Sequence, residues 1–299
     1  MAFRTVVISN ETELHVQSGQ LVAVQDQITR IPIEDIAVLV LEHPRTHVSA
    51  AALSLLTGQG VAVAVCDSKH MPTGLLLPHC AHSRQLAVTR HQLSQTLPQR
   101  KRLWQRIVRS KIENQAACLD ALDLGDTARL REYATAVQSG DATGMEAAAA
   151  RLYFRRLIPG FTRRAAEGPG GALDYGYAIL RAAVARSLVG HGLYPAIGLH
   201  HDGQLNAFNL ADDILEPYRP FTDYLAVDQA VNVESQTGRQ TLVSVLQMPC
   251  VIQGRSHSVL TAIEATASSL VKAMADKDAA SLVLPSMVTP GAIPQSISE

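Results

Sequence analysis

The chain has 299 residues, of which 47% are hydrophobic and 18% charged, so it can bury a sizeable core and is not a disordered chain. Its net charge of −1 excludes nucleic-acid binding driven by overall charge. Local basic patches stay open, because salt screens charges over roughly 8–10 Å. No apolar run reaches the length of a membrane span, and no signal peptide is recognisable. We therefore expect a soluble, cytoplasmic protein with no membrane partner.

The first 78 residues have the pattern of a small β-rich domain. Apolar residues alternate around Ser18-Gly19, which predicts a β-hairpin. Continuous apolar runs at 36–41 and 61–66 are typical of strands buried on both faces, and residues 49–56 predict a short helix between them. The four cysteines are scattered without a Cys-x-x-Cys pair, so we expect no structural zinc and interpret residues 79–85 as a linker.

From residue 86 onward the apolar spacing is helical. Helices are predicted over residues 84–96, 99–122, 128–137, 174–189 and 256–275, and residues 221–231 should also be helical. Residues 240–248 fit a strand or a helix. The predicted fold class is α+β, with a small N-terminal β-rich domain (1–78) followed by a larger, mostly α-helical domain (86–286). The Pro/Ser-rich end lacks a pattern from Pro285 onward, so residues 287–299 are assigned to a disordered tail.

The helix expected over 99–122 carries a run of basic residues from Arg100 to Lys111. Such a run is commonly the solvated face of a helix. It could equally be a face that contacts phosphates. The residues alone leave both interpretations open.

Residues 198–220 concentrate the groups that could do chemistry. His200-His201 precede a short acidic segment that contains Asp212, Asp213 and Glu216. Asn209 is expected to be the N-cap of a helix there, and Pro217 and Pro220 are expected to end it. One imidazole and one or two carboxylates suit a divalent cation such as Mg²⁺ or Mn²⁺. The same acids would also be favourable partners of a helix N-terminus without any metal.

A second acidic position is Glu146, at the start of a helix predicted from residue 145. Thr143 and Glu146 have the spacing of a capping box. Glu146 also points along the apolar stripe of Ala149, Ala150 and Tyr153, where a carboxylate is costly unless it is paired or binds a cation. Capping and metal ligation are both possible roles.

Taken together, these motifs resemble the CRISPR-associated integrase family, Cas-one, in the branch that accompanies the single large RNA-guided effector nuclease. The resemblance rests on four segments and extends to about residue 285. They are the end of the β-rich domain (CDSKHMPTGLLLP, 66–78), the helix with Glu146 (EAAAARLYF, 146–154), a central helix (DYGYAIL, 174–180) and the stretch 198–220. The family often has Gly after the glutamate, where this chain has Ala147; Ala favours a helix, so we expect no loss of ligation.

The resemblance implies that Glu146, His201 and Glu216 bind a Mg²⁺ or Mn²⁺ ion and are the catalytic residues, with Asp213 as a further candidate ligand. It implies an integrase and endonuclease of CRISPR adaptation. In that reaction the 3′-hydroxyl of a short DNA duplex, the spacer precursor, attacks the repeat boundary of the CRISPR array by transesterification.

Partners also follow from the resemblance. They are double-stranded DNA, a second copy of the chain held through the N-terminal domain, the small Cas-two protein and the large effector nuclease. Phosphate contacts would position the DNA without reading its sequence. The candidate contact residues are basic positions near the site: Arg84, Arg151, Arg155, Arg163, Arg164 and Arg219.

Two rival functions remain compatible with the residues. A structure-selective repair nuclease would use the same site, with water in place of the 3′-hydroxyl. A DNA-holding scaffold would bind DNA without catalysis, although three intact ligand-type residues argue against it. A zinc peptidase is disfavoured because the chain contains no His-Glu-x-x-His motif.

Overall fold

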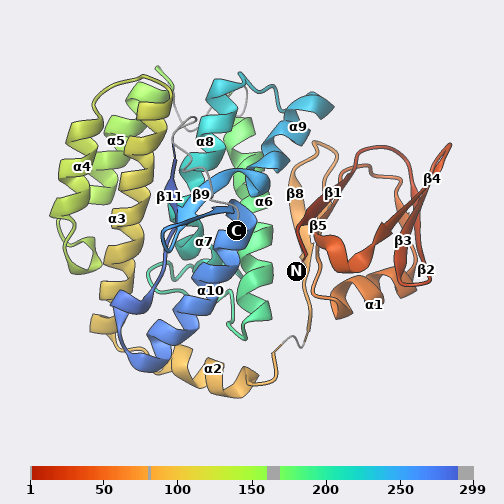
Figure 1. Cartoon of the computed structure of the whole chain (residues 1–299), viewed down its shortest axis with the longest axis horizontal. Coiled ribbons are helices and arrows are strands. Elements are labelled where there is room, and N and C mark those ends of the chain that lie inside the picture. Colours follow the sequence, from red (N-terminus) through yellow and green to blue (C-terminus); the bar gives the residue numbers. More distant parts are fainter. Residues whose placement is uncertain (1, 80–81, 160–168, 289–299) are drawn as a thin grey trace, which may run out of the picture.

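The computed structural model describes residues 2–79, 82–159 and 169–288. A strand-rich N-terminal region lies beside a larger helical body (Figure 1). The strands of the N-terminal region are β1 (Arg4–Ile8), β2 (Glu13–Gln17), β3 (Gln20–Val24), β4 (Ile28–Pro32), β5 (Ile36–Leu41), β6 (His47–Val48), β7 (Ala62–Cys66) and β8 (Pro72–Leu76). Helix α1 (Ala50–Gly58) and the single turn η1 (Ile33–Asp35) complete this region.

The helical body begins with α2 (Gln85–Leu93) and ends in a short sheet. Its long helices are α3 (Leu97–Ala121), α4 (Thr127–Ala136), α5 (Met145–Leu157), α6 (Pro169–Gly190) and α10 (Val259–Asp276). Its shorter helical segments are η2 (Ser139–Asp141), α7 (Asn209–Leu215), η3 (Glu216–Tyr218), α8 (Arg219–Asp228), α9 (Gln236–Val243), η4 (Ser244–Gln247) and η5 (Ala279–Ser281). Its strands are β9 (Pro249–Ile252), β10 (Arg255–Ser258) and β11 (Ser286–Met287). The predicted α+β fold class is confirmed.

Two four-stranded sheets form the N-terminal region. In the first, with order β1-β5-β7-β8, the first three strands run parallel and β8 is antiparallel. In the second, with order β4-β3-β2-β6, only β6 runs parallel to its neighbour. The predicted hairpin is the β2–β3 pair. Its two turn residues, Ser18 and Gly19, both have positive φ, as the favoured two-residue turn requires.

Strand β5 is apolar throughout because both of its faces are covered. Val38 and Val40 pack into the large core of the helical body, whereas Leu39 packs into a smaller core with α1 and the second sheet. This alternation follows from the two-residue period of a strand. The first sheet therefore lies between two cores, and α6 runs along the side of the helical body that faces it (Figure 1).

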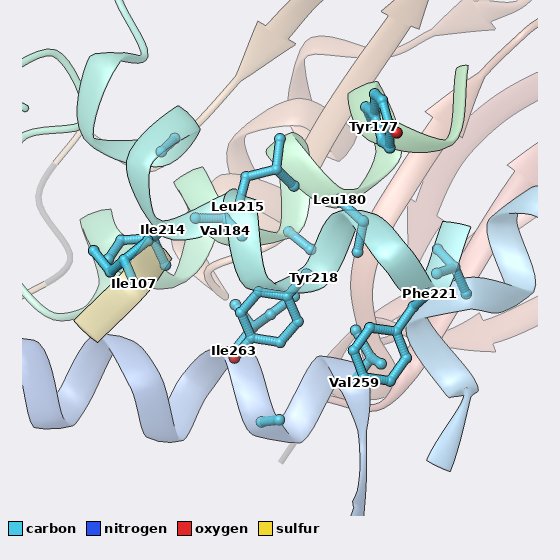
Figure 2. Packing of buried hydrophobic residues seen from close by; sticks show 14 of the residues in the cluster. Ile107, Tyr177, Leu180, Val184, Ile214, Leu215, Tyr218, Phe221, Val259 and Ile263 are labelled. Atoms are coloured by element: carbon cyan, nitrogen blue, oxygen red, sulfur yellow. The ribbon is translucent and has the colours of Figure 1, made fainter. Parts of the chain in front are cut away.

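The centre of the helical body is filled by apolar residues of several helices, among them α3, α6, α7, α8 and α10. Tyr218 and Phe221 are fully buried and lie over Val259 and Ile263 of α10 (Figure 2). On another side, α6 approaches α8 closely, and a Cβ added at Gly176 would lie 2.3 Å from Cγ2 of Thr222. This close approach holds the elements that carry the site at fixed positions. No helix in the three described ranges is long and apolar enough to cross a bilayer.

Helix α7 ends at Leu215, as expected from Pro217, but the chain does not leave the helical conformation there. The chain stays helical from α7 through η3 into α8. Each proline stands in the first turn of the segment that follows, where its missing N–H would have no intrahelical acceptor in any case.

Further corrections concern the C-terminal region. Of the two structures left open for residues 240–248, the helix is the one observed, over residues 240–247, and the strand β9 comes after it. The last long helix starts at Val259, capped by the side chain of Ser258, because the residues before it pair with β9 as β10. Ser286 and Met287 form β11 on β9, so Met287 does not begin a disordered tail. A two-residue strand is too short to show periodicity. Residues 289–299 lie outside the described residues, and the domain bounds stay a prediction.

Candidate active site

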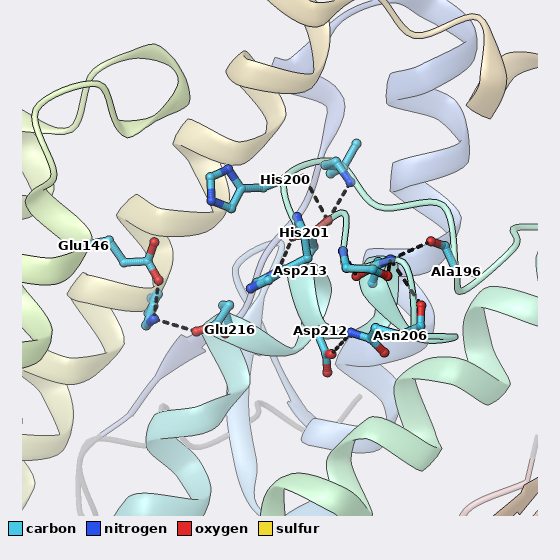
Figure 3. Close-up of polar contacts among 12 residues, drawn as sticks. Glu146, Ala196, His200, His201, Asn206, Asp212, Asp213 and Glu216 are labelled. Carbon is cyan, nitrogen blue, oxygen red and sulfur yellow. Dashed lines mark hydrogen bonds and ion pairs between the residues drawn. The ribbon is translucent and has the colours of Figure 1, made fainter. Parts of the chain in front are cut away.

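The three residues predicted as metal ligands come from three separate elements and line one cleft. Glu146 is in the first turn of α5, His201 lies in the loop before α7, and Glu216 opens η3. The cleft has a volume of about 410 Å³. Figure 3 shows Glu146 and Glu216 pointing toward one another, with His201 nearby. The fold therefore brings these side chains together across 70 residues of sequence.

Helix α5 is capped by Asp141 rather than by Thr143, so the predicted capping box is wrong. The Asp141 carboxylate accepts hydrogen bonds from the backbone N–H groups of Met145, at 2.8 Å, and Glu146, at 3.1 Å. Gly144 adopts a positive φ of 65° at the cap position, which turns the chain so that Asp141 can reach these donors. The Glu146 side chain needs no capping role and faces the cleft.

Asn209 is likewise not an N-cap. It is the first residue of α7, after Phe208 at the cap position. Its amide bridges the preceding loop: it donates to the carbonyl oxygens of Ala196, Gly203 and Asn206 and accepts from the N–H of Gly203. Asn209 therefore folds the loop that carries the histidines.

Asp213 is the anchor of His201. This carboxylate is fully buried and accepts hydrogen bonds from the backbone N–H groups of Leu199, His200 and His201. It also lies 2.7 Å from Nδ1 of His201. A proton on Nδ1 shared with Asp213 leaves the lone pair of Nε2 free for a cation. The hydrogen bond to Asp213 raises the pKa of His201. With both oxygens occupied in this way, Asp213 orients the ligand-type histidine.

The two adjacent histidines differ in their surroundings. His200 stacks on Trp104 of α3, with ring centroids 4.2 Å apart and planes 2° from parallel. His201 meets the same indole edge-on and lines the cleft. Gly198 makes this tight loop possible, because a Cβ there would lie 2.2 Å from the carbonyl oxygen of His201. This placement agrees with His201, rather than His200, as the ligand candidate.

Glu216 is buried between two cations. Its Oε2 lies 2.6 Å from Nζ of Lys111, and its Oε1 lies 2.9 Å from Nε of Arg219. Burial by itself would raise the pKa of Glu216, but attraction to Lys111 and then to Arg219 outweighs it and lowers this pKa to about 2. Glu216 is therefore ionised at any physiological pH. Arg219 also covers the ring of Tyr177, with its guanidinium carbon 4.4 Å from the centroid.

Lys111 is a site residue that sequence reasoning missed. Its ammonium lies 2.7 Å from Oε1 of Glu146 as well as against Glu216, so it bridges the two carboxylates. Burial would lower the pKa of Lys111, but Glu216 and Glu146 raise it, and the group stays charged. Helical spacing could have found it: Lys111 follows Ile107 by four residues and Val108 by three, on the buried face of α3.

Asp223 is the other residue that was missed. It lines the same cleft, is buried, and accepts hydrogen bonds from the hydroxyls of Tyr153, at 2.8 Å, and Tyr177. Burial raises the pKa of Asp223 to about 6, although the two tyrosine hydroxyls oppose the shift. Glu216 and Asp223 are seven residues apart, the spacing of one helical face, but the prolines concealed the continuous helix.

The remaining predicted residues are dispersed. Asp212 pairs with Arg181 and with Asn206, away from the cleft. Among the candidate DNA-binding residues, Arg151 and Arg155 are exposed on α5, Arg84 is exposed just before α2, and Arg219 is committed to Glu216. Arg163 and Arg164 lie outside the described residues.

The donor set suits a hard divalent cation, since it combines two carboxylates with a half-buried imidazole. Both oxygens of Glu216 already face cations, with Lys111 Nζ 2.6 Å from Oε2 and Arg219 Nε 2.9 Å from Oε1, so this position favours positive charge. In the described ranges, however, no three His, Cys, Asp or Glu side chains are gathered tightly enough to hold an ion. The ammonium of Lys111 lies between the two glutamates instead.

The sequence is similar to known proteins over most of its length. The family model described as CRISPR associated protein Cas1 matches residues 5–239. A relative, the CRISPR-associated endonuclease Cas1 of Neisseria meningitidis serogroup C (strain 8013), is 40% identical over 297 residues, which cover 96% of this chain and 97% of the relative. The chain belongs to the Cas1 family. The resemblance drawn from the sequence motifs is thereby confirmed.

Solved structures share the Cas1 fold with this chain at low sequence identity. A structure described as a casposase bound to integration product has a TM-score of 0.74 at 17% identity, covering 93% of this chain and 91% of that one. A chain of a Cas6-RT-Cas1–Cas2 complex has a TM-score of 0.72 at 17% identity, covering 97% of this chain and 36% of that one. At such identities the similarity concerns the fold alone.

Proposed function

We propose that this Cas1-family protein is an integrase of CRISPR adaptation, which inserts short DNA duplexes into the CRISPR array. The 3′-hydroxyl of the duplex would attack a phosphodiester at the repeat boundary. Endonuclease activity would follow when water takes the place of that hydroxyl. The observation that carries the proposal is the convergence of Glu146, His201 and Glu216 on one cleft in a member of this family.

A Mg²⁺ or Mn²⁺ ion is proposed as the cofactor, held by Glu146, His201 and Glu216. When bound, it would polarise the phosphoryl oxygen and stabilise charge on the attacking and leaving oxygens. The support for this site is the chemistry of its donors and the fact that Glu146 and Glu216 already share one cation, the ammonium of Lys111. Asp213 would orient His201 for this role through their 2.7 Å contact.

In the proposed transesterification a bond forms between phosphorus and the attacking 3′-oxygen. The bond from phosphorus to the leaving 3′-oxygen breaks, and the proton of the attacking hydroxyl ends on the leaving oxygen. Arg219 keeps Glu216 ionised during this exchange and fixes its orientation. The buried floor formed by Tyr177 and Asp223 closes one side of the cleft to water.

DNA contacts are proposed at the exposed residues Arg151 and Arg155, which lie on the helix that carries Glu146. Double-stranded DNA as substrate, Cas2 as partner, a homodimer through the N-terminal region and contact with the effector nuclease complete the proposal. For Cas2, the support is the family membership and the fold shared with a chain of a Cas1–Cas2 complex.

Strand transfer tests the proposed function. The protein and its Cas2 partner are mixed with a labelled duplex, a supercoiled repeat-bearing plasmid and Mn²⁺. We expect wild type to join the label to the plasmid, and Glu146→Gln, His201→Asn and Glu216→Gln each to lower joining by at least about 100-fold, as loss of a metal ligand should. Matched controls are Glu132→Gln and His257→Asn, which change exposed residues away from the cleft.

The outcomes separate the rival functions. Plasmid nicking without joined label would favour a nuclease. DNA binding without either product, while the complex with Cas2 forms, would favour a scaffold. Equal loss in the control variants would mean that the site variants fail for reasons other than the site.

A further inference from the structure

The bridge made by Lys111 is the most unusual contact of the cleft. Its Nζ lies 2.7 Å from Glu146 Oε1 and 2.6 Å from Glu216 Oε2, and the residue is only 9% exposed. These two carboxylates are two of the three proposed metal ligands. A Mg²⁺ ion binds carboxylate oxygens at about 2.0–2.1 Å, so it and the ammonium cannot occupy the space between these oxygens together.

Charge leads to the same conclusion. Two carboxylates held close together repel one another in a partly desolvated cleft and need a cation between them. Of the two glutamates Arg219 pairs only with Glu216, so Lys111 is the cation that contacts both. A divalent cation arriving at this position would have to compete with an internal one.

A second observation shows where the ammonium can go. Gln115 lies one turn beyond Lys111 on α3, is 2% exposed and lines the same cleft. Its Oε1 is buried and has no hydrogen-bond partner among the described residues. An unpaired acceptor of this kind is costly unless it is used in another state of the protein. Residues four apart on a helix are neighbours, so the lysine can reach it by rotating its side chain.

We infer that Lys111 is a displaceable internal cation of this site. Its ammonium neutralises Glu146 and Glu216 in the metal-free protein and moves to Oε1 of Gln115 when a divalent cation binds. The arrangement keeps the two carboxylates preorganised without metal and makes the apparent metal affinity depend on the strength of the lysine bridge. This inference rests on the proposed metal site and adds a residue that sets its affinity.

The test measures Mn²⁺ binding to the full-length, metal-stripped protein, followed by the electron paramagnetic resonance signal of free Mn²⁺. Lys111→Met removes the competing charge and should tighten binding by about tenfold, equivalent to about 1.4 kcal/mol. Lys111→Arg places a planar guanidinium between the carboxylates. This group pairs with both carboxylates more firmly than an ammonium does, so it should weaken Mn²⁺ binding by a similar factor. Lys101→Met is the matched control, since this lysine is exposed on the same helix, and it should not change binding.

The role of Gln115 is tested with Gln115→Leu. This change removes the acceptor for the displaced ammonium, so it should weaken Mn²⁺ binding several-fold. It should have no effect in a Lys111→Met background, where no ammonium has to move. Melting curves in EDTA establish that each variant is folded. If Lys111→Met does not fold, the Mn²⁺ affinities of Lys111→Arg and Gln115→Leu test the inference instead.

Two kinds of failure are distinguishable. If wild type binds no Mn²⁺, or binds it equally well after Glu216→Gln, the proposed metal site is wrong. If wild type binds Mn²⁺ through Glu216 but Lys111→Met binds no more tightly, or Lys111→Arg no more weakly, the metal site stands and the displaceable lysine is refuted.

Discussion

Glu216 illustrates how a carboxylate can be kept charged inside a protein core. It is only 5% exposed, yet its pKa is lowered because Lys111 and Arg219 contact its two oxygens. Removing either partner would leave a buried charge poorly compensated, which is far more costly than losing a surface ion pair. A carboxylate held in this way is ionised at neutral pH, as a cation ligand must be.

This shift makes a prediction about stability and pH in the metal-free protein. The folded pKa of Glu216, about 2, lies below its ordinary value of 4.5. Its contribution is therefore complete above pH 4.5 and is lost as the pH falls toward 2, with a full size of about 3 kcal/mol. Urea unfolding in EDTA at several pH values should show wild type and Glu216→Gln converging in free energy of unfolding between pH 4.5 and 3.

Glu132→Gln provides the control, because this exposed glutamate forms only a surface pair with Arg129. Its difference from wild type should be small at every pH. A constant gap between wild type and Glu216→Gln from pH 7 to pH 3 would contradict the assignment of the lowered pKa to Glu216.

For single residues, the sequence predicts those whose chemical type suits the site. It misses those whose role depends on where the folded chain places the side chain. Glu146, His201 and Glu216 could be named from acids and a histidine in recognisable motifs. Lys111 was one of several cations on a basic helix. It differs from its exposed neighbours only in lying on the buried side of α3. Asp213 was named, but its role as an anchor depends on the fold of the loop.

Among the elements, the continuous run of α7, η3 and α8 has the largest effect on the site. It carries Asp213, Glu216 and Asp223, so the anchor, the ion-paired carboxylate and the cleft floor belong to one helical path. Its position depends on close packing against α6, where Gly176 meets Thr222. A side chain at Gly176 would push this path away from α6.

Gly176→Ala should therefore destabilise the protein. The new Cβ would lie 2.3 Å from Cγ2 of Thr222, and overpacking of this kind costs about 1–3 kcal/mol. Thr222→Ser, which removes that methyl group, should restore part of the stability. Urea unfolding of both variants and of the double variant measures the coupling.

The matched control lies on the same helix. A Cβ added at Gly190 would meet no heavy atom within 4 Å, so Gly190→Ala should be neutral or slightly stabilising. If Gly176→Ala is as harmless as Gly190→Ala, the close α6–α8 packing does not constrain the site.

Periodicity predicts the long helices well, since their buried stripes recur over several turns. It fails for β9, β10 and β11, which have four, four and two residues and are too short to show a period. Pro217 marks the end of α7, but the sequence did not show that η3 and α8 follow at once, because a proline that ends one helix and a proline that starts the next are identical in sequence. Which applies depends on whether the following turn is buried, as it is here.

At the scale of the whole molecule, the N-terminal sheet and the helical body are joined by a buried polar network as well as by their shared core. Glu42, just beyond β5, is 1% exposed. Its Oε1 accepts a hydrogen bond from the hydroxyl of Tyr175 on α6 and lies 3.2 Å from Nε of Arg239 on α9. These partners are 133 and 197 residues away, so no local pattern could have predicted the contact.

This network predicts that a change in the N-terminal region destabilises the helical body. Glu42→Gln leaves Arg239 buried without its counterion, which should cost about 3–5 kcal/mol. The chain has a single tryptophan, Trp104, buried on α3 of the helical body, so its fluorescence reports on that part alone. In urea, Glu42→Gln should lower the midpoint of the Trp104 transition as much as that of the far-ultraviolet circular dichroism.

Glu34→Gln is the matched control, because Glu34 is exposed and lies in the same region. It should change the free energy of unfolding measured by either signal by no more than about 0.5 kcal/mol. If Glu42→Gln shifted the circular dichroism but left the Trp104 transition in place, the two regions would unfold separately. The stability of the cleft would then not depend on the sheet, since the residues that line the cleft come from the helical body. A common shift of both signals would instead mean that the N-terminal sheet stabilises the cleft through Tyr175 on α6 and Arg239 on α9.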